Sequence, residues 1–297
     1  MRALAEFIMR GRMQATLVVV GCAALPLLFW LSAAAGALVL LRRGLNDAMG
    51  VIGWALLPAF VWWYFGDPRT LLVLLGALGL AMLLRSSVSW SRVMLCSVGL
   101  GLLYAWALGE VFGEPIAAVA GELQKVLPGT LSDAYEQLSA AERERLEGLL
   151  APVLTGLLAA LMQMVTLLSL MLGRYWQGVL YNPGGFGREF QTLRFRPLLA
   201  FLLLMGMLIG PNLGVQFAVL TPLCSVPLFF AGLALVHGLV AQGRLARFWL
   251  VGLYVTLVLF MHMIYPLLAV VAVVDSLFDF RGRASRNNGA GPANGEG

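Results

Sequence analysis

Long apolar stretches separated by short polar gaps make up most of the chain. A helix needs about 20 apolar residues to cross the roughly 30 Å of hydrocarbon in a bilayer, and runs near that length recur throughout. They cover residues 16–41, 51–65, 71–84, 93–109, 149–172, 198–240 and 248–277. This pattern predicts an all-α protein that forms a polytopic transmembrane helix bundle.

The first and the last apolar runs each contain a proline, Pro26 and Pro266. In the first run we expect one helix over 14–30 and then a return over 32–41, which is too short for a full helical crossing. In the last run we likewise expect a helix out and a short return. The bundle is therefore predicted to have about eight full spans plus two short or re-entrant segments.

The basic residues indicate the orientation, because Lys and Arg are retained on the cytoplasmic side during membrane insertion. If both terminal runs double back, 16 of the 20 basic residues lie on one side. If both runs are single crossings, the two sides carry ten each. We therefore predict a multi-pass protein of the bacterial inner membrane whose N- and C-termini are both cytoplasmic.

The chain is predicted to be one transmembrane bundle over 1–281, followed by a disordered cytoplasmic tail over 282–297. This tail is rich in Gly, Asn and Arg, a composition that cannot bury enough apolar surface to fold. Residues 110–148 form the one long polar stretch, with eight acidic and three basic residues. We predict that this stretch is an acidic, amphipathic insertion on the extracytoplasmic side.

Two patterns predict structure within the insertion. Apolar residues recur at helical spacing from Ile116 to Leu127, which favours a helix lying on the outer membrane surface. Ser139 and Glu142 have the spacing of a capping box, in which two side chains satisfy the first free N–H groups of a helix. A new helix is therefore expected to begin after Ser139.

Composition and motifs exclude several classes of function. The net charge is +5, yet the arginines are spread over many short gaps, which does not favour nucleic-acid binding. The three cysteines lie far apart in apolar runs, and the sequence contains neither a P-loop nor an HExxH motif. We therefore expect no enzyme, no metal site and no cofactor.

Polar residues within the later apolar runs are the candidates for a ligand pocket, because a polar side chain inside a membrane needs a partner or a cavity. These candidates are Gln163, Asn212, Gln216, Ser225 and His237. For Gln163 the alternative is a structural hydrogen bond between helices. For His237 the alternative is a hydrogen-bonded or interfacial position.

Gly206, Gly210 and Gly214 form two overlapping GxxxG spacings close to these candidates. Small residues at this spacing let two helix backbones approach closely. The prolines nearby would also free carbonyl groups for a ligand. Helix packing is the favoured interpretation, because GxxxG is common in membrane helices.

A second set of candidates lies in the gaps expected on the cytoplasmic side. The loop over 173–196 and the end of the last run supply charged residues for an interaction with another protein, namely Arg188, Glu189, Arg194, Asp275, Asp279 and Arg281. Asp275 and Asp279 share a helical face. They are able to hold a cation, but pairing with the neighbouring arginines is the favoured interpretation.

Four short motifs occur in order along the chain, at 41–44 (LRRG), 187–195 (GREFQTLRF), 232–237 (GLALVH) and 275–281 (DSLFDFR). Together they resemble the YybS-like family of bacterial membrane proteins, and the resemblance covers nearly the whole chain. That family is similar in outline to the substrate-binding membrane components of energy-coupling-factor vitamin transporters, and more remotely to the rod-shape protein MreD. The resemblance implies a small-molecule-binding bundle or a membrane scaffold.

This chain departs from the vitamin-transporter components in its extra spans and its acidic insertion. It also lacks an AxxxA helix at the place where an energising partner docks, since Ala33 and Ala37 have the spacing but lie in the short return segment. These departures weaken the expectation of active transport.

The lipid bilayer is an expected partner of this protein. For its function, the sequence leaves two hypotheses. In the first, the protein binds a small-molecule ligand or takes part in its transport, using a pocket among the helices of 149–172 and 198–240. In the second, it is a scaffold that binds a protein partner through the acidic insertion or the 173–196 loop. A polar cavity in the bundle would favour the first hypothesis, and a solid core would favour the second.

Overall fold

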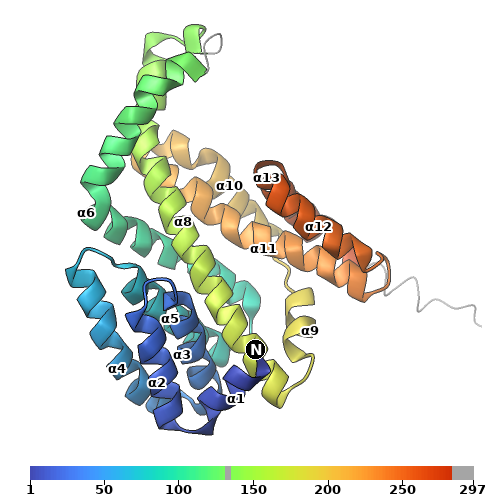
Figure 1. Cartoon of the computed structure of the whole chain (residues 1–297). Coiled ribbons are helices and arrows are strands. Elements are labelled where there is room, and N and C mark those ends of the chain that lie inside the picture. Colours follow the sequence, from blue (N-terminus) through green and yellow to red (C-terminus); the bar gives the residue numbers. More distant parts are fainter. Residues whose placement is uncertain (131–134, 283–297) are drawn as a thin grey trace, which may run out of the picture.

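The computed structural model describes residues 1–130 and 135–282, and every regular element in that part of the chain is helical (Figure 1). The all-α class is therefore confirmed. Six helices are long and apolar enough to cross a membrane. They are α4 (Leu45–Tyr64), α5 (Arg69–Ser87), α6 (Trp90–Thr130), α8 (Ala140–Tyr181), α11 (Leu220–Ala241) with the 3-10 turn η1 (Val215–Val219) before it, and α13 (Met261–Phe278).

The expected count of about eight full spans is not confirmed, because three further apolar helices are short. They are α2 (Arg12–Ala24), α10 (Pro197–Leu213) and α12 (Phe248–Leu259), with 13, 17 and 12 residues. At 1.5 Å per residue, the shortest of them is about 18 Å long. That length is well below the roughly 30 Å of a bilayer core.

The opening apolar run doubles back. Helix α2 is followed by a turn over 25–28 and by α3 (Phe29–Arg43). Arg43 at the end of α3 donates from Nη2 to the carbonyl of Met9, at 2.7 Å, so the start of α2 and the end of α3 lie on the same side of the bundle. The reversal comes earlier than expected: α2 ends at Ala24, and Leu25 is extended, as is favoured for a residue that precedes a proline. Trp30 therefore belongs to the returning helix.

The hydrophobic pattern did not predict the short helix that precedes this unit. Helix α1 (Arg2–Arg10) packs against the bundle through its buried residues Ala5 and Ile8. Three of its other residues are charged, so this stretch is not apolar enough to be predicted as a membrane span. It is an amphipathic helix of the kind that lies along a surface.

The closing run also doubles back, but the break is at Phe260 and not at Pro266. The short member is therefore α12, and Pro266 lies inside α13. Pro266 is the sixth residue of α13, where it removes one helical hydrogen bond, and the helix nevertheless continues to Phe278. Arg244, before α12, donates to the carbonyl of Phe280, after α13, at 2.9 Å, so the two ends of this hairpin meet.

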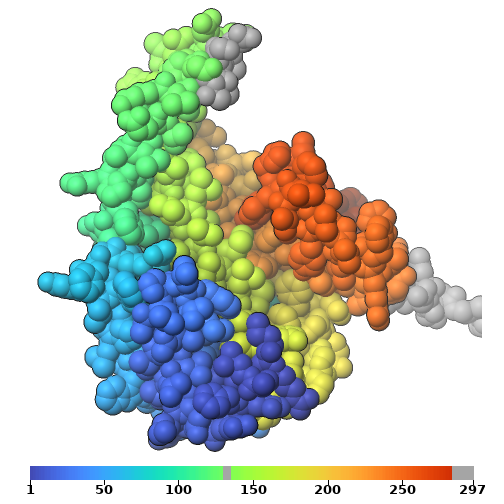
Figure 2. Space-filling model, in the orientation of Figure 1, coloured from blue at the N-terminus to red at the C-terminus, as the bar shows by residue number. Residues whose placement is uncertain are grey.

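The predicted insertion is an arm made by α6 and α8, which continue together beyond the other helices (Figures 1 and 2, green). Helix α6 departs from helical geometry at Phe112, and α8 begins with the expected capping box at Ser139 and Glu142. The apolar stripe does not form a separate surface helix. Two of its members, Ile116 and Ala120, are buried in the arm, because α8 covers them in place of the membrane surface.

Several predicted features fall on residues that the structure does not describe. Asp133, one of the acidic residues of the insertion, is among them. The predicted disordered tail also lies outside the described residues, except for Gly282.

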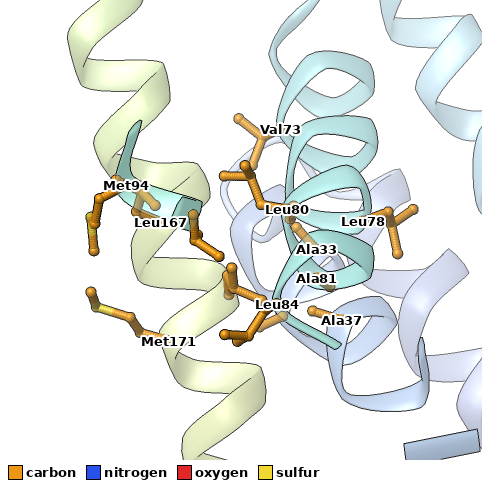
Figure 3. Close-up of a cluster of buried hydrophobic side chains, with 14 of the residues drawn as sticks. Ala33, Ala37, Val73, Leu78, Leu80, Ala81, Leu84, Met94, Leu167 and Met171 are labelled. Carbon is orange, nitrogen blue, oxygen red and sulfur yellow. The ribbon is translucent and has the colours of Figure 1, made fainter. Parts of the chain in front are cut away.

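Helix α3 lies at the centre of the bundle, against α5 and α8. Figure 3 shows Ala33 and Ala37 among the side chains of Leu84, Leu167 and Met171. A Cβ atom added to Gly173 of α8 would lie 2.8 Å from the carbonyl oxygen of Ala34, so the two backbones are in direct contact. The Ala33–Ala37 spacing therefore serves packing inside this chain.

Candidate functional site

A cavity of about 800 Å³ lies between α8, α9 (Gly185–Gln191), α11 and α12, and we call it the distal cavity. Aromatic and aliphatic side chains supply most of its wall. They include Leu168, Met171, Phe186, Phe229, Leu233 and Leu257. A cavity of this volume with apolar walls is typical of sites that bury most of a small ligand.

A few polar groups lie at one end of the distal cavity. Nε2 of His237 on α11 is 2.8 Å from the hydroxyl of Tyr254 on α12, and the ring of Phe190 meets the imidazole edge to face. Gln191 also lines the cavity, and its carbonyl oxygen would lie 3.0 Å from a Cβ atom added to Gly238, the residue after His237. Because no charged side chain lines the cavity in the described part of the chain, a charged ligand group would remain unpaired there, at a cost of several kcal/mol or more. The site therefore suits an uncharged ligand.

A second cavity of about 450 Å³, here the proximal cavity, lies between α8, α10, α11 and α13. The three hydroxyl groups that line it are already hydrogen-bonded, and its fourth polar side chain, His262, is exposed. Ser225 donates to the carbonyl of Pro222 at 2.7 Å and is 2.9 Å from the hydroxyl of Tyr265. Thr221 donates to the carbonyl of Met207 at 2.8 Å.

One row of α11 residues lines both cavities. Its members recur every four positions and are Thr221, Ser225, Phe229, Leu233 and His237. Residues four apart are neighbours on a helix surface, so the row winds gradually around α11. The spacing of four could have indicated this part of the cavity wall. From the sequence, only the polar residues Ser225 and His237 of this row were predicted to line a pocket.

The structure does not bring the five predicted pocket residues together. Ser225 and His237 line different cavities, and Gln163 lines neither. Gln163 is fully buried and donates from Nε2 to the hydroxyl of Ser97 on α6 at 2.9 Å, while its Oε1 has no hydrogen-bond partner. The interhelical hydrogen bond that was its alternative role is thus present.

The remaining two predicted pocket residues lie at the reversal between α10 and α11. Asn212 accepts a hydrogen bond from Nη2 of Arg145 on the arm at 2.6 Å, and Gln216 is exposed on η1. Neither side chain faces one of the two cavities. Polar groups gather at this reversal because its backbone groups have no helical partners.

Two of the three GxxxG glycines serve helix packing, as favoured from the sequence, whereas Gly214 ends α10 with a positive φ of 145°. A Cβ atom added to Gly210 would lie 2.8 Å from the carbonyl oxygen of Phe217, and one added to Gly206 would lie 2.8 Å from the sulfur of Cys224. Both contacts join α10 to the segment that follows it. These glycines therefore hold the α10–α11 hairpin closed.

The second predicted set is largely brought together, as an ion network at the end of α13. Arg281 pairs with Asp275 at 2.7 Å and also donates to the carbonyls of Gln191 and Leu193. Arg194 pairs with Asp279 at 2.9 Å. Asp275 is almost completely buried. The acidic pair is thus neutralised by arginines, as favoured from the sequence, and joins α13 to the chain between α9 and α10.

The predicted 173–196 loop is mostly helical and bound to the bundle. Helix α8 extends to Tyr181, and α9 follows. Glu189 pairs with Arg174 and accepts a hydrogen bond from Nε1 of Trp90 at 3.2 Å. Of the three predicted interaction residues in this segment, only Arg188 is exposed, in a long 3.5 Å contact with Asn182. Most of this segment is therefore occupied by internal contacts.

Comparison of the chain with family models, with curated proteins and with solved structures gave no match. The resemblance to the YybS-like family stays a prediction. The contacts above are therefore the basis for a functional proposal.

Proposed function

We propose that the protein binds an uncharged amphiphilic small molecule within the membrane, as a ligand-binding or transport-associated component. The observation that carries the proposal is the distal cavity, which offers about 800 Å³ of apolar space and one hydrogen-bonding end at His237 and Tyr254. An apolar wall favours a hydrocarbon part of the ligand, and the polar end favours a hydroxyl or carbonyl group. The bundle is not solid at this place.

Helix α12 is the wall through which such a ligand would enter from the lipid. No residue of α12 is buried, and the contact of Tyr254 with His237 is the polar link that ties it to α11 in the described residues. A helix with few buried contacts separates from its neighbours at a low free-energy cost. Entry therefore requires no change in α8 or α11.

Filling the distal cavity is expected to weaken ligand binding. Leu168→Trp places an indole in the cavity, and we expect the affinity for geraniol, a short isoprenoid alcohol, to fall about tenfold. Binding is measured by scintillation proximity with labelled geraniol and immobilised protein in detergent. Leu157→Trp is the matched control, because Leu157 lies on the same helix, lines only the proximal cavity and is 53% exposed against 49% for Leu168. An equal loss in both variants would contradict the proposed site.

A scaffold role is the second candidate, and the arm is the observation that favours it. The arm extends beyond the bundle (Figure 2). Val119 and Leu123 on the arm expose apolar side chains in a stretch that also carries acidic residues. A protein partner would use this surface, since the 173–196 segment is bound internally. Co-purification of a partner that disappears when 113–147 is replaced by a short linker would support this role, and co-purification that persists would argue against it.

We also propose that the protein lies in the bacterial inner membrane with both termini in the cytoplasm. The distribution of 16 of the 20 basic residues and the doubling back of both terminal runs support this orientation. Alkaline phosphatase fused after Gly282 is expected to be inactive, and the same enzyme inserted after Gly129 in the arm is expected to be active. An active fusion at the C-terminus would reverse the orientation.

A further inference from the structure

The distal and proximal cavities share two residues. Met164 of α8 and Met261 at the start of α13 line both of them. Both cavities also lie along one row of α11 residues, from Thr221 to His237. The two spaces are therefore neighbours along one interface between α8 and α11, separated where the two methionines meet it.

The separation consists of flexible groups. A methionine side chain is unbranched and adapts to irregular gaps, so it changes position at little cost. Met261 is 54% exposed, and Met164 is partly buried. Neither side chain is fixed by complete burial in the core.

The combined length exceeds that of one membrane leaflet. The α8 residues that line the two cavities run from Val153 to Val179, a rise of about 39 Å at 1.5 Å per residue. A bilayer has a hydrocarbon core of roughly 30 Å, so one leaflet provides about half of that. A chain that fills both cavities is therefore longer than the acyl chain of one leaflet.

The two ends of this space differ in the hydrogen bonds that they can offer. At the proximal end, the hydroxyls of Thr221 and Ser225 already donate to backbone carbonyls. At the distal end, Gln191 lines the cavity, and no hydrogen bond joins its side chain to another described residue. Its carbonyl oxygen would lie 3.0 Å from a Cβ atom added to Gly238, the residue that follows His237. The distal end is therefore the place for a polar head group.

We propose that the two cavities form one site for a single long hydrocarbon chain with an uncharged, hydrogen-bonding head group. The head lies at Gln191 and His237, and the chain passes Met164 and Met261 to end near Ser225. This inference rests on the proposed ligand binding and adds the length and the direction of the ligand. Because no charged residue lines either cavity in the described part of the chain, an alcohol or carbonyl head is favoured over a phosphate.

Two isoprenoid alcohols with the same head group test the proposal. Geraniol is short enough for the distal cavity alone, and solanesol is long enough to fill both. In the double variant Met164→Trp with Met261→Trp, indole rings close the passage between the cavities. We expect the affinity for solanesol to fall about tenfold. The affinity for geraniol is expected to fall by a smaller factor, because the two methionines line the distal cavity only where it adjoins the proximal one.

Met263→Trp is the matched control, because Met263 is exposed on the same helix and lines neither cavity. It is expected to bind both alcohols as the unaltered protein does. If the double variant loses solanesol and geraniol equally, or loses neither, the single long site is wrong while ligand binding stands. If the unaltered protein binds neither alcohol, the proposed function itself fails.

A second variant covers the case in which the double tryptophan variant does not fold. Met164→Ala with Met261→Ala widens the passage and is expected to bind solanesol at least as tightly as the unaltered protein. Its affinity for geraniol should change less than its affinity for solanesol. Loss of solanesol binding in this widened variant would overturn the proposal.

Discussion

Replacing Arg281 with methionine is expected to lower the free energy of unfolding by about 3–5 kcal/mol. The carboxylate of Asp275 is 3% exposed and the Arg281 side chain 10% exposed. The substitution leaves a buried carboxylate without its main partner and also removes the bonds to the carbonyls of Gln191 and Leu193. The effect is measured by reversible unfolding of the purified protein in mixed detergent micelles.

The control for this effect is Arg188→Met. Arg188 is exposed and has only a long contact with Asn182, so its loss is expected to change the unfolding free energy by less than about 0.5 kcal/mol. Replacing both partners, with Asp275→Leu added to Arg281→Met, should recover part of the lost stability, because no unpaired charge remains. Similar losses for Arg188→Met and Arg281→Met would show that the buried pair is unimportant.

Gly232→Ala is expected to cost about 1–3 kcal/mol of unfolding free energy. A Cβ atom at Gly232 would lie only 2.2 Å from the carbonyl oxygen of Leu268. That oxygen belongs to the backbone of α13, so relief requires α13 to move away from α11 as a whole. The same unfolding assay in mixed micelles measures the loss.

Gly252→Ala on α12 is the matched substitution, because nothing lies within 4 Å of its added Cβ atom. We expect it to leave stability unchanged or to raise it by about 0.4–1 kcal/mol, since alanine has less backbone freedom to lose on folding. If the two alanine variants are equally stable, the close contact of α11 with α13 does not determine the packing of these helices.

The helical class was predictable because it depends on the length of the apolar runs. That length can be read from each run without knowing which other parts of the chain it contacts. The doubling back of the terminal runs was also predictable. It places more basic residues on one side of the membrane than single crossings would. The break points were not predictable, because a proline marks the region of a break without fixing its residue. The turn precedes Trp30 in one run, and Pro266 lies within α13 in the other.

The predicted site was less accurate because polar partners come from distant parts of the chain. Ser97, the partner of Gln163, is 66 residues away, and Arg145, the partner of Asn212, is 67 residues away. No local pattern indicates such pairs. Asp275 and Arg281 were matched correctly because they are six residues apart and share one helix end.

The arm and the cavities have one helix in common. Helix α8 has 42 residues, which makes a rod of about 63 Å. Pro152 deprives this rod of one backbone bond immediately before Val153, where the lining of the proximal cavity begins. The other rod of the arm, α6, has its irregular residue Phe112 at the same base. A sideways force on the tip of the arm is therefore expected to bend it at Pro152 and Phe112. The arm would move while the ligand-lining part of α8 stays in position.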